Sequence, residues 1–240
     1  MCKLLFVILL AVLPVHLTGE PLFRSEHAPE RQAKSRSLKI LAIGDSNGAL
    51  KEGWVYQLQK LRSNDTIFNI SISGNTIGFN NLGRSSLNTL SSIGSYMDRA
   101  YTRLGSIDII IIMLGTNDCK AVFKDSLSFV PENIRKLTGG IRNQAKLHKD
   151  KPIIYIVSPP PFGPDNMLDE KYKGGLDRIT WLNEELSKNE GEGNVRFINS
   201  FRILLPVFRN LTIDGVHLNP DGQRMIALII EENLKYFIMK

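Results

Sequence analysis

The sequence predicts an α/β fold: a flavodoxin-like three-layer α/β/α sandwich in which helices cover both faces of a five-stranded parallel sheet. Two observations support this prediction. From Leu38 onward, short runs rich in β-branched residues alternate with longer segments of helical character. One of these runs, residues 109–114, is apolar at every position. Such a run is typical of a central parallel strand that is covered on both faces.

Each short apolar run is predicted as a strand, and the five runs are Leu38–Ile43, Ile67–Ile72, Ile107–Leu114, Ile153–Val157 and Val195–Ile198. The intervening segments are predicted as helices over about residues 51–62, 85–103, 131–148, 169–189 and 220–237. A proline followed by an acidic residue, as at Pro131 and Pro220, is typical of a first helical turn. The alternation shows no internal repeat, so we expect one domain over residues 38–240.

The first 37 residues are expected to lie outside this domain. Lys3 precedes an apolar run from Leu4 to Val15, and Leu17-Thr18-Gly19 is suited to signal-peptide cleavage. A short membrane anchor is the alternative, but about twelve apolar residues are too few to span a hydrocarbon core of about 30 Å. We therefore expect a signal peptide over 1–19, a flexible polar leader over 20–37, a secreted or periplasmic protein, and no stable membrane anchor.

The composition is that of an ordinary globular protein, with 42% hydrophobic residues, 22% charged residues and a formal net charge of +6. The basic residues form no Lys/Arg-rich block, so no nucleic-acid partner is expected. Cys2 would leave with the signal peptide, and Cys119 is then predicted to be a lone packed thiol. Of the three Asn-X-Ser/Thr sequons, the one at Asn69 falls in a strand that is expected to be buried.

Polar motifs follow the predicted strands. Gly44-Asp45-Ser46-Asn47 closes the first strand, and Asp214-Gly215-Val216-His217 lies just before the last helix. Gly74 and Asn117 each follow another strand. Since the carboxyl ends of parallel strands meet at one edge of the sheet, these residues are expected to form one site.

These residue types point to acyl transfer. A serine hydroxyl becomes a good nucleophile when a histidine takes its proton and an acid fixes the imidazole, roles that Ser46, His217 and Asp214 can fill. Gly74 and Asn117 are candidate oxyanion donors. Each motif also has a purely structural interpretation: Asp214 could cap a turn, Gly74 could supply a positive φ, and Asn117 could end its strand. Ser46 also matches the G-x-S-x-G elbow of α/β-hydrolases, but its place after the first strand argues against that fold.

The chain resembles the SGNH, or GDSL-type, hydrolases from Ile40 to about Ile229. Ser46, Gly74, Asn117 and His217 match the four signature residues of that family, and Asp214 matches its acid. The resemblance implies an SGNH hydrolase fold, an oxyanion hole formed by Ser46, Gly74 and Asn117, and no metal or other cofactor. The usual leucine after the serine is replaced by Asn47, and we expect this change to alter the pocket wall and not the mechanism.

Two further segments, 107–123 and 156–164, resemble the arylesterase branch, whose members hydrolyse short acyl esters and transfer acyl groups to alcohols. The sequence therefore predicts a secreted serine esterase that acts on short-chain, acetyl-type esters of small molecules or carbohydrates. The alternatives are a lysophospholipase or acyl thioesterase of the same fold, and a catalytically silent carbohydrate-binding domain. Asp45 and Asp118, the other acids near the site, are expected to hold the loop backbones by hydrogen bonds.

Overall fold

The five strands form one sheet of order β2-β1-β3-β4-β5 in which every neighbouring pair is parallel. The computed structural model describes residues 36–238, with side chains as far as Lys235. The strands are β1 (Lys39–Gly44), β2 (Thr66–Asn69), β3 (Ile109–Met113), β4 (Ile153–Val157) and β5 (Val195–Ile198). The predicted fold class and all five predicted strands are confirmed. The predicted signal peptide and the leader up to Ser35 lie outside the described residues.

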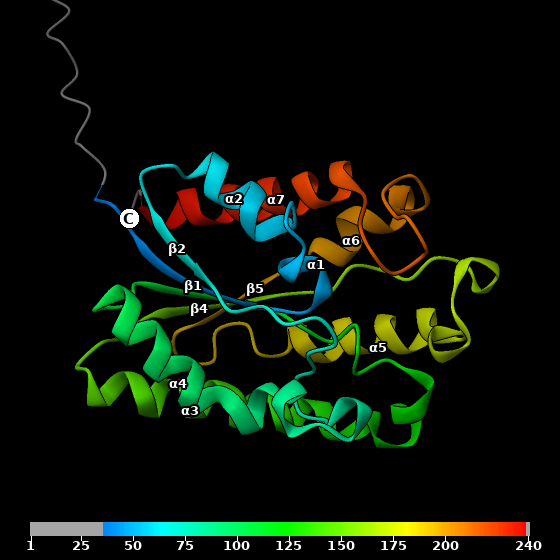
Figure 1. Cartoon of the computed structure of the whole chain (residues 1–240), viewed down its shortest axis with the longest axis horizontal. Helices are drawn as coiled ribbons and strands as arrows, with labels where there is room; N and C mark the ends of the chain where they lie inside the picture. The colour runs from blue at the N-terminus through cyan, green and yellow to red at the C-terminus, as the bar shows by residue number, and fades with distance from the viewer. Residues whose placement is uncertain (1–35, 239–240) are drawn as a thin grey trace, which may run out of the picture. The chain divides into compact units, whose positions relative to one another are not determined.

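The helices connect the strands and form two outer layers. They are α1 (Ser46–Ala49), α2 (Trp54–Leu61), α3 (Thr89–Leu104), α4 (Val130–Leu147), α5 (Gly175–Ser187), α6 (Ser200–Leu204) and α7 (Pro220–Ile238). Figure 1 shows α2, α6 and α7 on one face of the sheet and α3, α4 and α5 on the other. Short 3₁₀ segments lie at 81–83, 85–87, 121–129, 165–167, 170–172 and 205–210. No helix within residues 36–238 is long and apolar enough to cross a membrane.

The central strands supply side chains to both hydrophobic layers. In β3 all five residues are buried: Ile110 and Ile112 pack with the helices on one face, and Ile109 and Ile111 with those on the other. Successive side chains of a strand point to opposite faces, so a strand with helices on both sides must be apolar throughout. This geometry explains the uninterrupted apolar run at 109–114.

Several element boundaries differ from the prediction for local reasons. The helix predicted from residue 85 begins at Thr89, because the Oδ1 atom of Asn88 accepts a hydrogen bond from the Ser91 amide and caps α3. The helix predicted from 169 begins at Gly175, after a 3₁₀ turn and a left-handed Gly174 with φ +63°. The predicted burial of Asn69 is wrong: β2 is an edge strand, and Asn69 is exposed.

Candidate active site

The turn that carries Ser46 is the direct continuation of the inner strand β1. Asp45 follows the strand and is 1% exposed, and its Oδ1 atom accepts a hydrogen bond of 3.0 Å from the Asn47 amide. This bond caps the short helix α1, which begins at Ser46. The turn has no room for a side chain at Gly44, where a Cβ atom would lie 2.8 Å from Ser71 Oγ. The tight turn leaves Ser46 only partly buried, at the carboxyl edge of the sheet.

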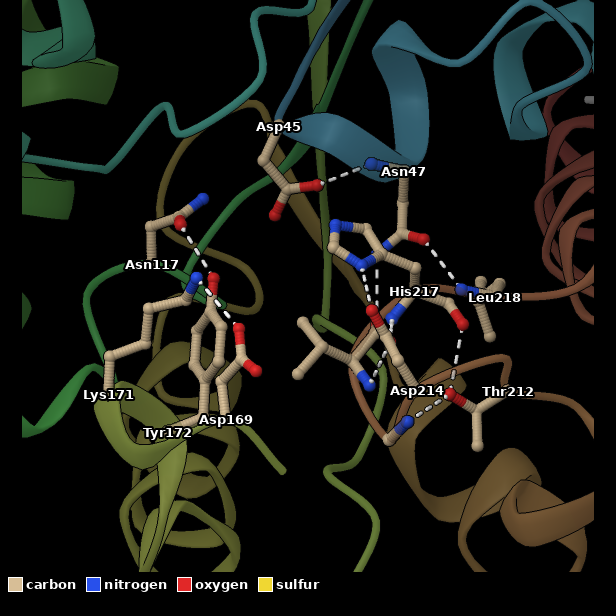
Figure 2. A network of polar contacts seen from close by, with 12 residues as sticks. Asp45, Asn47, Asn117, Asp169, Lys171, Tyr172, Thr212, Asp214, His217 and Leu218 are labelled. Atoms are coloured by element: carbon tan, nitrogen blue, oxygen red, sulfur yellow. Dashed lines mark hydrogen bonds and ion pairs between the residues drawn. The ribbon is translucent and has the colours of Figure 1, made fainter. Parts of the chain in front are cut away.

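Asp214 binds His217 through both its carboxylate oxygens (Figure 2). Its Oδ2 atom lies 2.7 Å from Nδ1 of the imidazole, and its Oδ1 atom accepts the backbone amides of Val216 at 2.9 Å and His217 at 2.7 Å. Although desolvation acts in the opposite direction, the hydrogen bonds from His217 and Val216 keep the pKa of Asp214 below its ordinary value. The acid is therefore an anion at neutral pH and holds the imidazole by Nδ1.

The loop that carries this pair is anchored at several points. Thr212 Oγ1 donates to the His217 carbonyl and accepts from the Gly215 amide, both at 2.9 Å. Gly215 has φ +83°, and a Cβ atom there would lie 2.7 Å from a methyl carbon of Leu168. Its carbonyl accepts the Gly163 amide at 2.8 Å, which ties the loop to the proline-rich segment after β4. Glycine at 215 is thus required by both backbone conformation and close packing.

The structure places Ser46 and His217 on adjacent segments without a direct hydrogen bond. Among residues 36–238, Nδ1 of His217 is bonded to Asp214, and the Ser46 hydroxyl has no hydrogen-bond partner. Catalytic hydrogen bonds are often long before substrate binds. Asn47, the residue after Ser46, holds the two segments together through hydrogen bonds to Val216 and Leu218.

Asn47, which was expected to alter the pocket wall, does not reach the surface. Its side chain is fully buried and contacts the His217 loop. Its Oδ1 atom accepts hydrogen bonds from the Leu218 amide at 2.9 Å and from Gln223 Nε2 at 3.1 Å, and its Nδ2 atom donates to the Val216 carbonyl at 3.4 Å. A polar side chain can be buried here because each of its polar atoms has a partner.

The candidate oxyanion donors meet near the same edge. Gly74 has φ +85°, and neither its amide nor that of Ser46 donates a hydrogen bond to any of the residues from 36 to 238. Asn117 is 2% exposed, and its Nδ2 atom donates to the Asn75 carbonyl at 3.0 Å, which leaves a second N–H of the amide. The geometry therefore leaves donors from three segments free for a ligand.

Three side chains that were not predicted, Tyr172, Lys120 and Asn81, hold the segments of Asn117 and Gly74 in place. Tyr172 donates a hydrogen bond to Asn117 Oδ1 across 3.3 Å, as Figure 2 shows. Lys120 Nζ donates to Asn81 Oδ1 at 3.2 Å and lies 5.6 Å from the centre of the Tyr172 ring, while Asn81 Nδ2 donates to the Gly74 carbonyl at 2.6 Å. Burial, followed by the nearby charge of Lys171, lowers the pKa of Lys120. Nothing in the sequence motifs indicated these contacts.

Asp45 and Asp118 have the structural roles that were predicted. Both oxygens of Asp118 lie 3.0 Å from the Ile77 amide, so this acid holds the loop that follows Gly74. Burial raises the pKa of Asp118 to about 7 and also raises that of Asp45.

Cys119 is a free thiol that is fully buried, as predicted. Burial raises the pKa of this thiol well above its usual value, so it stays protonated. The described part of the chain contains no group of three or more His, Cys, Asp or Glu residues arranged to hold a metal ion.

Comparisons with known proteins agree with this arrangement. The sequence profile of the GDSL-like lipase/acylhydrolase family matches residues 41–225. Est24, described as a carbohydrate acetylesterase from Sinorhizobium meliloti, superposes with a TM-score of 0.67 at 21% identity over 84% of this chain and 100% of its own. The native aryl esterase of M. smegmatis superposes with a TM-score of 0.68 at 22% identity, over 83% of this chain and 99% of its own.

A putative arylesterase from Agrobacterium tumefaciens str. C58 also has this fold, with a TM-score of 0.65 at 21% identity over 82% of this chain and 97% of its own. At these identities the superpositions establish the fold alone. No curated protein matches the sequence significantly. The family profile, in contrast, spans most of the chain and both motifs of the site. The chain therefore belongs to the GDSL-like lipase/acylhydrolase family and is a carboxylic ester hydrolase.

Proposed function

We propose that this protein is a secreted serine esterase that removes short acyl groups, acetyl foremost, through Ser46, His217 and Asp214. The observation that carries the proposal is the pairing of Asp214 with His217 at 2.7 Å on a loop that is bonded to the turn of Ser46. A serine hydroxyl becomes a nucleophile when a nearby histidine can take its proton. An acid that is hydrogen-bonded to the histidine orients the imidazole for this step.

The proposed first step is acylation of Ser46. Because Nδ1 of His217 is bonded to Asp214, the free Nε2 atom accepts the hydroxyl proton as Ser46 Oγ attacks the ester carbonyl. Asp214 stabilises the resulting imidazolium, and its lowered pKa keeps it ionised for this purpose. The developing oxyanion accepts hydrogen bonds from the amides of Ser46 and Gly74 and from Asn117 Nδ2.

The second half of the reaction restores the enzyme. His217 gives its proton to the leaving alkoxide, so the alcohol departs neutral and the acyl group remains on Ser46 Oγ. Water then gives a proton to His217 and attacks the acyl carbon. The bond to Ser46 Oγ breaks, Oγ takes the proton from His217, and the carboxylic acid leaves. An alcohol can take the place of water at this step, which would give acyl transfer.

The substrate proposal is supported by the proteins that share this fold. Est24 of Sinorhizobium meliloti is described as a carbohydrate acetylesterase, and the M. smegmatis neighbour as an aryl esterase. We therefore favour acetyl esters of carbohydrates or small molecules.

The decisive experiment compares Ser46→Ala with Ser71→Ala on an aryl acetate. Ser71 is a matched control, since its hydroxyl lies beside the same turn and has no hydrogen-bond partner among the described residues. We expect Ser46→Ala to lose nearly all turnover and Ser71→Ala to keep it. A serine-directed phosphonate should label Ser46, as located by peptide mass spectrometry. More than a few per cent of wild-type turnover in Ser46→Ala would exclude it as the nucleophile.

The acyl chain and the location need separate tests. With aryl esters from C2 to C12, kcat/KM should be highest at C2–C4; a maximum at C8 or above would indicate a lysophospholipase or a long-chain thioesterase. Activity on none of these esters would favour a silent binding domain. For location, N-terminal sequencing of the extracellular or periplasmic protein should give a start near Glu20. An intact Met1 in the cytosol would contradict secretion.

A further inference from the structure

Asn47 connects the turn of Ser46 to the loop of His217 across a large distance in sequence. Its Oδ1 atom accepts the Leu218 amide at 2.9 Å, and its Nδ2 atom donates to the Val216 carbonyl at 3.4 Å. These two partners are the residues immediately before and after His217. In Figure 2 the bond from Asn47 to Leu218 runs beside the imidazole.

The same side chain is fixed from its other side by Gln223. Gln223 Nε2 donates to Asn47 Oδ1 at 3.1 Å, and Gln223 Oε1 accepts the Trp54 amide at 2.8 Å. Asn47 Oδ1 therefore accepts two hydrogen bonds, the number its lone pairs allow. Asn47 and Gln223 are 0% and 2% exposed, so water does not compete for these bonds. The network joins α1, the start of α2 and the first turn of α7.

We propose that Asn47 is a positioning residue that sets the distance between Ser46 and the imidazole of His217. This role rests on the proposed function of Ser46 and His217. Asn47 is the next residue after Ser46, and its partners Val216 and Leu218 are the residues on either side of His217. Since a misplacement of about 1 Å can cost about 10²-fold in rate, a bond network of this kind has a direct effect on turnover.

The usual residue of the family at this position cannot make these contacts. A leucine has a similar volume but no polar atoms, so the Leu218 amide and Gln223 Nε2 would be buried without their present acceptor. The Asp214–His217 pair, in contrast, is internal to the loop and does not depend on Asn47. Replacement of Asn47 should therefore separate the base from the nucleophile while it leaves the pair of acid and base intact.

The test compares Asn47→Leu with wild type and with a matched control, Asn189→Leu. Asn189 is 4% exposed, and among the residues described its side chain bonds only to the carbonyls of Leu186 and Glu185 at the nearby helix end. We expect Asn47→Leu to lower kcat on an aryl acetate by about 10- to 100-fold. KM should change by less than about threefold, because the substrate contacts remain. Asn189→Leu should lower stability without changing kcat per folded molecule.

Two NMR measurements separate positioning from collapse of the loop. The downfield proton between His217 Nδ1 and Asp214 should persist in Asn47→Leu, and the Leu218 amide should exchange faster than in wild type. A kcat within twofold of wild type would overturn the proposal, and so would a fall in kcat that accompanies loss of the downfield proton. Unchanged exchange at Leu218 would also contradict it. Ser46→Ala is measured alongside: if it remains active, the proposed function itself fails, and the role of Asn47 in catalysis fails with it.

Discussion

The hydroxyl of Tyr172 donates a hydrogen bond to Oδ1 of Asn117 across 3.3 Å. With Oδ1 occupied in this way and Nδ2 bonded to the Asn75 carbonyl, the Asn117 amide has one orientation. Its remaining N–H therefore has a fixed direction before any substrate arrives, as the proposed role of Asn117 as an oxyanion donor requires. Burial, followed by the charges of Asp45, Asp214 and Asp169, raises the pKa of Tyr172, so its hydroxyl stays a donor.

We predict that Tyr172→Phe lowers kcat by about 3- to 10-fold with little change in KM, because a neutral hydrogen bond contributes about 1 kcal/mol. Tyr101→Phe is the matched control. Tyr101 is equally buried, and its hydroxyl has no hydrogen-bond partner among the residues described. Equal rates for wild type and Tyr172→Phe in steady-state assays would show that Asn117 is oriented without Tyr172.

We predict that Asn117→Ala lowers kcat by about 10²-fold and changes KM much less, because an oxyanion donor acts mainly in the transition state. Circular dichroism and thermal unfolding should show that the variant folds. A rise in KM at constant kcat would instead assign Asn117 to substrate binding. Loss of the fold would mean that Asn117 chiefly ends its strand.

We predict that Gly215→Ala destabilises the protein more than Gly193→Ala does. Both glycines have positive φ, +83° and +66°, which costs other residues about 1–2 kcal/mol. A Cβ atom at 193 meets nothing within 4 Å, whereas at 215 it would lie 2.7 Å from Leu168. Denaturant unfolding compares the two free energies, and only Gly215→Ala should also lower kcat. Equal effects would mean that Leu168 moves aside freely.

We predict that stability decreases as pH rises from about 4 to 7, in part because of Asp118. Its folded pKa of about 7 lies above the ordinary 3.8, so the folded state binds the proton more tightly in this window. For one group the slope of the unfolding free energy is at most about 1.4 kcal/mol per pH unit. Urea unfolding between pH 4 and 8 should show that Asp118→Asn lacks this contribution. Parallel curves for variant and wild type would show that Asp118 has no such pKa.

The sequence by itself determined the layers of the fold and the residues that form the motifs. Strand β3 was predictable because burial on both faces requires an apolar residue at every position. The gathering of Ser46, Gly74 and Asn117 at one edge followed from parallel strands, whose carboxyl ends meet. Short elements such as α1 and α6 were not predicted, because four or five residues are too few to show a helical period.

Only the tertiary structure decided what holds the site in place. Asn47 bonds to partners 169 to 176 residues away, and Tyr172 reaches Asn117 across 55 residues. The periodicity of a sequence indicates which face of a helix or strand is buried. It does not indicate which buried polar atoms form hydrogen bonds with one another. Because a buried asparagine must find specific partners, its role depends on the packing of distant segments. For this reason Asn47, which was expected to alter the pocket wall, instead links the turn of Ser46 to the loop of His217.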